Sequence, residues 1–313
     1  MSAAIRIAGF ATLLVAIFAL ASVTGAAVDP NVAESDGHEE TMEVMSGHSA
    51  HGSKSKTDPG GVPGLAVAEG GYSFVPETTR IQRGESVDFR FRIAAESGET
   101  VQDFDLEHER RMHLIVVRRD FEGFQHLHPR QLGGGGWEVD LSLSKGGVYR
   151  AFADFATDGA SLTLASDLFV PGPFEPSRLA SPTGTSKAGD GYEVSLDSSA
   201  PSAGGTNPAR FIVRRNGNEL QSVEPYLGAD GHLVALREHD QAFLHTHPEG
   251  EAGGPGPISF GVEYPSAGSY RLFLQFKHRG EVRTAAFTQE VVGAGGASNA
   301  SEHAEEGASH GGR

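Results

Sequence analysis

Residues 112–129 read MHLIVVRRDFEGFQHLHP, and residues 231–248 read GHLVALREHDQAFLHTHP. The two stretches align without a gap: His113 corresponds to His232, and each later residue of the first stretch matches the residue 119 positions further on. The apolar run after each of these histidines predicts a strand. A phrase that recurs at a constant offset is typical of two copies of one domain.

The rest of the sequence between residues 63 and 293 also has the pattern of short strands. Val87–Ile93 and Trp137–Leu143 alternate apolar and polar residues, which is the period of a half-buried strand. Clusters of Gly, Pro, Asp and Ser separate such runs, and no stretch after residue 30 sustains a helical period. We therefore predict an all-β protein.

A second repeated segment narrows the fold class. Gly147–Phe155 (GVYRAFADF) corresponds to Gly268–Phe276 (GSYRLFLQF), at an offset of 121. Both segments resemble the tyrosine-corner strand of immunoglobulin-like sandwiches, although the usual Cys of that strand is absent. The resemblance implies two tandem immunoglobulin-like β-sandwich domains, which we place at residues 63–173 and 174–293.

The two ends of the chain lack the strand pattern. Residues 1–27 combine a weakly basic start, an apolar run and small residues, which predicts a cleavable signal peptide, with an uncleaved anchor as the alternative. Residues 28–62 and 294–313 are rich in Gly, Ser and charged residues, and we predict a disordered linker and tail. The chain has no Cys, which suggests an exported bacterial protein stabilised by its cores alone.

The formal net charge of −16 disfavours nucleic acid and anionic membrane surfaces as partners. It is compatible with the attraction of cations, and equally with the solubility of an acidic secreted protein. The expected partners are a metal ion and another extracytoplasmic protein. Membrane contact is expected only through an uncleaved N-terminal segment.

The histidines of the repeated phrase predict a metal site through the geometry of a hairpin. Side chains two residues apart in a strand share a face, so His126 and His128 point the same way. If the turn centres between Asp120 and Phe121, His113 lies directly across from His128 and three imidazoles converge. The same register in the second copy gathers His232, His245 and His247. Alternatively, these rings are structural and hydrogen-bonded within the fold.

Weaker ligand candidates surround these six histidines. Candidates for a fourth ligand in the first copy are His108, Asp154 and Met112. Strand alternation, however, points Met112 away from the histidines. Candidates in the second copy are His239, Glu224 and His278. The predicted linker adds imidazole and thioether groups, which together favour copper, Cu(I) especially: His38, Met42, Met45, His48 and His51.

Two likenesses to metalloenzymes are incomplete. His245-Thr246-His247-Pro248 resembles the metal-binding core of the JAMM metalloproteases, but the Ser and Asp that must follow are missing. The spacing of His245, His247 and Glu251 resembles the first cupin motif, but Leu132 stands at the matching position in the first copy and no second motif follows. A cupin-like metalloenzyme is the third alternative, and no catalytic residue is predicted.

The phrase at residues 113–129, followed by GGVYRAFADF at residues 146–155, resembles a module of secreted bacterial proteins of unassigned function. Some of these proteins lie beside heavy-metal-binding segments. The resemblance covers most of the first copy and, more weakly, the second, and it implies a β-sandwich. More distantly, the chain resembles exported copper-binding sandwiches of the CopC-like and cupredoxin kinds, but it lacks the Cys of a blue-copper site.

These patterns predict an exported, non-enzymatic protein that binds a transition metal, copper or zinc with copper favoured, at a histidine cluster in each sandwich. The main alternative is an extracellular or cell-surface interaction module whose histidines are structural. Alanine at the His-x-His pair would remove metal binding in the first case and only lower stability in the second.

Overall fold

The computed structural model describes residues 62–197, 200–244, 246–250 and 252–294. Within these ranges all regular structure is β, and no helix has the length and hydrophobicity needed to cross a membrane. The all-β prediction is therefore confirmed. The predicted signal peptide lies outside the described residues, as do the linker and the tail except for Val62 and Ala294.

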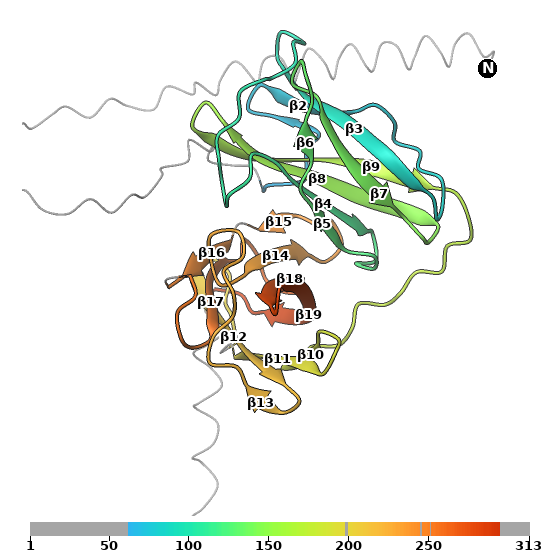
Figure 1. The fold of residues 1–313 in the computed structure, drawn as a ribbon. Helices are drawn as coiled ribbons and strands as arrows, with labels where there is room; N and C mark the ends of the chain where they lie inside the picture. The colour runs from blue at the N-terminus through green and yellow to red at the C-terminus, as the bar shows by residue number, and fades with distance from the viewer. Residues whose placement is uncertain (1–61, 198–199, 245, 251, 295–313) are drawn as a thin grey trace, which may run out of the picture. The chain divides into compact units, whose positions relative to one another are not determined.

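The first sandwich has two sheets, with strand orders β1-β2-β3-β7-β6 and β5-β4-β8-β9. Figure 1 colours it from blue to green. Its strands are β1 (Ala68–Glu69), β2 (Tyr72–Pro76), β3 (Ser86–Ala95), β4 (His113–Arg118), β5 (Gln125–Leu127), β6 (Arg130–Gln131), β7 (Trp137–Ser142), β8 (Gly147–Thr157) and β9 (Ala160–Val170).

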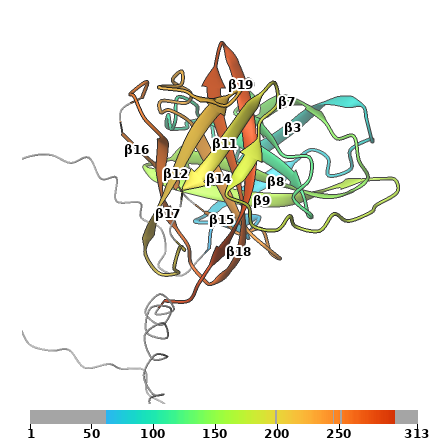
Figure 2. The same ribbon diagram turned by 90° about the horizontal axis from the view of Figure 1, so that it is seen from below.

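The second sandwich repeats this arrangement, with sheets β10-β11-β12-β17-β16 and β15-β14-β18-β19, and β13 beside β12. Its strands run from yellow to red in Figure 2. They are β10 (Thr185–Lys187), β11 (Tyr192–Asp197), β12 (Thr206–Arg215), β13 (Asn218–Glu219), β14 (His232–Arg237), β15 (Phe243–Leu244), β16 (Thr246–Glu249), β17 (Ile258–Glu263), β18 (Gly268–His278) and β19 (Glu281–Val291).

Both sandwiches have the strand order of an immunoglobulin-like fold. In the first, β2-β3-β7-β6 corresponds to strands A-B-E-D and β4-β8-β9 to C-F-G, with β5 beside C. In the second, β11-β12-β17-β16 and β14-β18-β19 take the same places, with β15 beside C. The prediction of tandem immunoglobulin-like sandwiches is confirmed.

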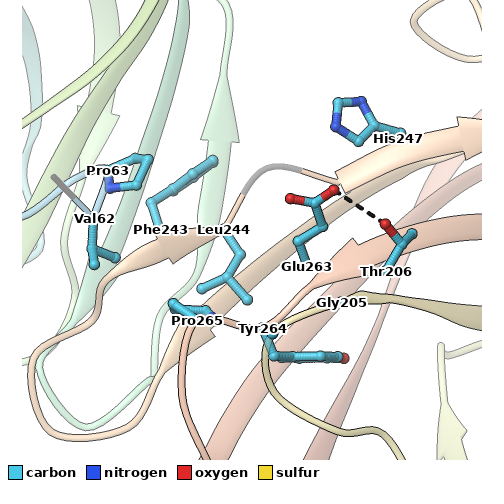
Figure 3. Close-up of a pocket in the computed structure, with 11 residues that line it drawn as sticks. Val62, Pro63, Gly205, Thr206, Phe243, Leu244, His247, Glu263, Tyr264 and Pro265 are labelled. Atoms are coloured by element: carbon cyan, nitrogen blue, oxygen red, sulfur yellow. Dashed lines mark hydrogen bonds between the residues drawn. The ribbon is translucent and has the colours of Figure 1, made fainter. Parts of the chain in front are cut away.

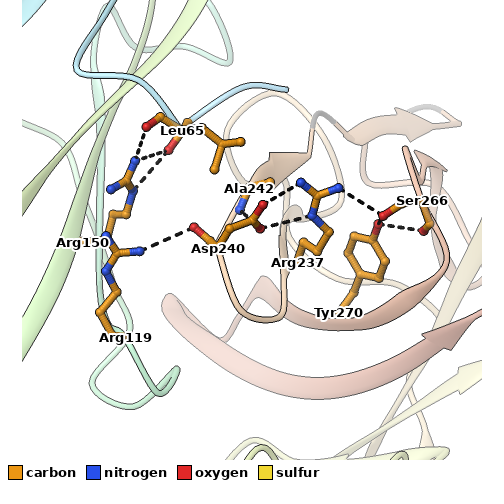
Figure 4. A network of polar contacts seen from close by, with 9 residues as sticks. Leu65, Arg119, Arg150, Arg237, Asp240, Ala242, Ser266 and Tyr270 are labelled. Atoms are coloured by element: carbon orange, nitrogen blue, oxygen red, sulfur yellow. Dashed lines mark hydrogen bonds and ion pairs between the residues drawn. The ribbon is translucent and has the colours of Figure 1, made fainter. Parts of the chain in front are cut away.

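A tyrosine corner closes the start of strand F in each copy. The Tyr149 hydroxyl donates to the Lys145 carbonyl at 3.0 Å, and the Tyr270 hydroxyl donates to the Ser266 carbonyl at 2.9 Å. Figure 4 draws the second of these bonds. The expectation drawn from the two repeated Gly-x-Tyr segments is met by this pair of bonds.

Strand β4 is buried on both faces. Leu114 and Val116 point into the core of the first sandwich, whereas Ile115 and Val117 belong to a separate apolar cluster. All four side chains are inaccessible to solvent. The separate cluster contains residues of both sandwiches, which lie in one compact unit of the chain.

The apolar cluster between the sandwiches is built from equivalent residues of the two repeats. Phe124 stacks on Phe273 with ring centroids 4.0 Å apart, and Phe152 packs on Phe243 at 5.5 Å. Because Phe124 corresponds to Phe243 and Phe152 to Phe273, the two contacts exchange partners between the copies. Such reciprocity is the mark of a two-fold, isologous interface, here within one chain.

Polar contacts border this cluster. The side-chain amide of Gln241 donates to the Arg118 carbonyl at 2.9 Å. The Arg119 guanidinium donates to the Asp240 carbonyl at 3.5 Å, as Figure 4 shows. The segment before β1 takes part as well, because the Phe243 amide donates to the Pro63 carbonyl at 2.9 Å. These bonds pair backbone groups that the contact between the sandwiches would otherwise leave unsatisfied.

Candidate metal centre

The hairpin that carries the first histidines has the predicted register. Leu114 of β4 lies opposite Leu127 of β5, and Ile115 lies opposite His126. Continuing this register by one step puts His113 opposite His128. His113, Ile115 and His126 therefore share the face of the sheet that looks away from the core of the first sandwich.

The three imidazoles converge as the register requires. One ring nitrogen from each of His113, His126 and His128 can be chosen so that all three lie within 4.8 Å of one another. The ring centroids are 5.1 Å apart for His113 and His126, and 4.8 Å apart for His126 and His128. Among the described residues, no other set of three His, Cys, Asp or Glu side chains meets this criterion.

Hydrogen bonds anchor two of these rings from outside. His113 Nε2 lies 3.3 Å from the Glu107 carbonyl oxygen, and His126 Nδ1 lies 2.7 Å from Oε1 of Gln275. Both partners are acceptors, so each neutral ring donates its single N–H outward. In these tautomers the inner nitrogens, His113 Nδ1 and His126 Nε2, which are 2.9 Å apart, both carry lone pairs and repel each other. A cation that both nitrogens bind removes this repulsion.

The third histidine also presents an unpaired nitrogen. Nε2 of His128 is buried and has no hydrogen-bond partner among the described residues. A buried polar atom without a partner is uncommon in folded proteins, and an ion is one of its ordinary explanations. The candidate donor set at this place is thus one imidazole nitrogen from each of the three histidines.

The electrostatics of the cluster keep the rings neutral. Burial, together with the neighbouring His113 ring, lowers the pKa of His126 to about 3 and the pKa of His128 to about 4. Burial also lowers the pKa of His113, although the carboxylate of Asp154 acts in the opposite direction. Neutral imidazole is the form that binds a metal ion, so these side chains are ready ligands near pH 7.

The second sandwich contributes two residues to the surroundings of the cluster. His232 at the start of β14 lies with its ring centroid 4.6 Å from His126 and 5.6 Å from His113. Gln275 on β18 lies opposite His232 in the sheet and accepts the hydrogen bond from His126. Burial and the His126 ring lower the pKa of His232 well below its ordinary value.

The second copy has the predicted register but not the predicted cluster. Ala235 lies opposite Leu244, in line with the register of the first copy. The chain then leaves the hairpin, and β16 pairs with β17 in the other sheet, with His247 opposite Gly261. His247 is exposed there, beside Glu263 in Figure 3, and does not join His232. His245 lies outside the described residues.

The weaker candidates are dispersed. Met112 is buried in the core of the first sandwich, on the side of β4 away from the histidines, as strand alternation predicted. The exposed His108 lies at the margin, with its ring centroid 6.2 Å from His113. The Asp154 carboxylate lies opposite His113 but accepts a bond from Thr163. The remaining candidates in the second copy lie apart from the cluster: His239, Glu224 and His278.

The predicted linker ligands lie outside the described residues. They are His38, Met42, Met45, His48 and His51. Two residues that the sequence analysis did not single out are important in the structure, Gln275 and Glu107. The sequence did hold a signal for the surroundings of Gln275. Ile115 and Val117 make the outer face of β4 apolar as well as its inner face, which indicates that another layer of the protein covers it.

Comparison with known proteins identifies the domain. The family described as a domain of unknown function, DUF8832, matches residues 66–172 and again residues 186–293. No curated protein matches the sequence.

Solved structures similar to the chain include an Escherichia coli adhesin, FdeC, at 14% identity, covering 73% of this chain and 66% of that one, with a TM-score of 0.25. A Salmonella alpha-2-macroglobulin has 16% identity over 76% of this chain and 15% of that one, with a TM-score of 0.26. A titin tandem of Ig domains has 13% identity over 71% and 97%, with a TM-score of 0.20. The chain thus spans less than two thirds of the first two, and similarity at this level carries no functional argument.

Proposed function

Because this domain matches twice and over most of the chain, the protein belongs to the DUF8832 family, and we propose that it is a non-enzymatic, extracytoplasmic protein that binds a transition-metal ion on the histidines of its first sandwich. The observation that carries the proposal is the pair of anchored rings, His113 and His126, whose inner nitrogens face each other 2.9 Å apart. The unpaired Nε2 of His128 supports it as a third donor.

The donor set favours a metal of borderline softness. Imidazole suits zinc and copper, and metal–nitrogen distances of about 2.0–2.1 Å place neighbouring ligand nitrogens about 3 Å apart. Because Met112 is turned into the core, the centre itself has no thioether ligand. We therefore propose Cu(II) or Zn(II) at the centre, while Cu(I) remains a proposal for the linker residues. The apolar segment near the N-terminus supports export.

Metal titration tests the proposal. We expect the purified full chain to bind one Cu(II) or Zn(II) ion that a variant with His126→Ala and His128→Ala does not bind, as measured by calorimetry and equilibrium dialysis. A matched variant with His239→Ala and His247→Ala removes two exposed histidines and should keep that ion. Sites in the linker contribute equally to all three proteins, so the difference in stoichiometry is decisive. Equal stoichiometry in all three would overturn the proposal.

A second candidate function is an interaction module whose histidines are structural. It is favoured by the short contact between His113 and His126, which is of hydrogen-bond length. If the Gln275 amide were reversed, its N–H would donate to His126, and a chain of hydrogen bonds from Gln275 through both rings to Glu107 would be complete without an ion. In this case the variant with His126→Ala and His128→Ala loses stability, and added metal does not stabilise the wild type.

A further inference from the structure

We propose that the second sandwich completes the histidine centre of the first, so that binding of the ion and docking of the two sandwiches are linked. The inference rests on the proposed function and adds a means of regulation to it. Its basis is the juxtaposition of Gln275 and His232 with His126, although the three donor nitrogens all come from the first sandwich.

Gln275 acts as a positioning residue. Its Oε1 accepts the Nδ1–H of His126, and this bond holds the proton on Nδ1 and leaves Nε2 free to bind an ion. The Gln275 Nε2 group lies 3.4 Å from the hydroxyl of Thr284 on the neighbouring strand, which can accept a hydrogen bond from it. Gln275 itself is 7% exposed, so water does not readily replace it as the acceptor.

His232 covers the same donors from the second sandwich. Its ring lies nearly parallel to that of His113, at an interplanar angle of 8°, and its centroid is 4.6 Å from His126. Beyond the histidines, the contact continues into the apolar cluster through Ile115 and Val234. Separation of the sandwiches would therefore expose the histidines to water and remove the Gln275 acceptor from His126.

Binding of the ion and docking of the two sandwiches are linked by thermodynamics. If the docked state binds the ion more tightly than the separated state, the ion stabilises docking by the same factor. Outer-sphere hydrogen bonds to ligating histidines typically change metal affinity about 10- to 100-fold. A similar factor is expected for the effect of the ion on the separation equilibrium.

The first test concerns Gln275. Gln275→Leu keeps the volume but removes the acceptor, and we expect Zn(II) affinity to fall about tenfold or more. Gln275→Glu keeps an acceptor at this place and should restore the affinity to the wild-type level or above. If Gln275 had only a structural role, Gln275→Glu would be the more damaging of the two variants. The reason is that an unpaired carboxylate at a buried position lowers stability more than leucine does.

The second test measures docking directly. Because the chain has no Cys, single cysteines can serve as reporters of exposure. Val117→Cys places a thiol in the cluster between the sandwiches, and Val116→Cys places one in the core of the first sandwich. Val117 is four residues along β4 from His113, or about 13 Å, so its thiol is no ligand. We expect Zn(II) to slow labelling of Val117→Cys about tenfold or more.

The two reporters separate linkage from simple stabilisation. If the ion stabilises only the first sandwich, Zn(II) slows labelling of Val116→Cys and leaves that of Val117→Cys unchanged, which overturns the inference. Wild-type affinity in Gln275→Leu would also overturn it. If the wild type binds no ion at all, the proposed function has failed. If it binds an ion through His126 and His128 while either linkage test is negative, the inference alone has failed.

Discussion

At the scale of single residues, the histidine centre depends on which ring nitrogen of each imidazole carries the proton. His113 and His126 each use their one N–H for an outer acceptor, Glu107 and Gln275. The nitrogens that remain, together with Nε2 of His128, are buried lone pairs. A protonated ring at this place would lie beside other imidazoles in a poorly hydrated setting, which explains the lowered pKa values.

These pKa values predict a pH dependence of stability in the presence of a chelator. The folded-state pKa is about 3 for His126 and about 4 for His128, against an ordinary value of 6.5. Below about pH 6.5 these two histidines become protonated in the unfolded chain but stay neutral in the folded state. The free energy of unfolding should therefore fall between about pH 6.5 and about pH 4, by up to about 1.4 kcal/mol per pH unit for each histidine.

Urea unfolding at a series of pH values measures this dependence. His126→Gln removes one of the groups, so the slope below about pH 6.5 should become shallower. His239→Gln is the control, because the His239 side chain is 91% exposed and should leave the slope unchanged. A slope that is the same in all three proteins would contradict the assignment.

At the scale of elements, β4 and the hairpin after it explain both the fold and the site. Apolar residues on both faces bury β4 between the core and the second sandwich. The two hairpins then diverge, because β5 continues to Leu127 whereas β15 ends at Leu244 and β16 starts at Thr246. This early departure carries His247 to the opposite sheet, whereas His128 stays beside His126 in the first copy.

The tyrosine corners provide a prediction at this scale. Tyr149→Phe removes the bond to the Lys145 carbonyl and should lower the free energy of unfolding by about 1 kcal/mol. Tyr72→Phe is the matched control, because its hydroxyl bonds Asp158 in an exposed setting, where we expect less than about 0.5 kcal/mol. Chemical denaturation of both variants checks this, and equal losses would argue against a structural role for the corner.

At the scale of the whole described unit, the two repeats meet through corresponding faces. Equivalent residues, such as Ile115 and Val234, lie in one apolar cluster, and the phenylalanine contacts are reciprocal. His113 and its counterpart His232 stack at 5.6 Å, as residues near a two-fold axis do. The histidine centre therefore lies at the edge of an interface that the duplication itself made possible.

Removal of one ring should uncouple the sandwiches. Phe273→Ala deletes the partner of Phe124 and, by the usual cost of such a deletion, should weaken the contact by about 3–5 kcal/mol. Scanning calorimetry should then show two separate transitions, whereas we expect a single cooperative transition for the wild type. Phe276→Ala, which lies in the core of the second sandwich alone, should lower that sandwich's stability without weakening the contact itself. Unchanged cooperativity in Phe273→Ala would refute the coupling.

The sequence by itself determined the duplication, the all-β class, the tyrosine corners and the register of both hairpins. These features depend on alternation and turn position, which are local and can be read along the chain. Only the tertiary structure decided which histidines meet. The bond from His126 to Gln275 joins residues 149 positions apart, and the departure of β16 depends on pairing with a distant strand. Such contacts arise when faces pack together, and no local pattern in the sequence specifies them.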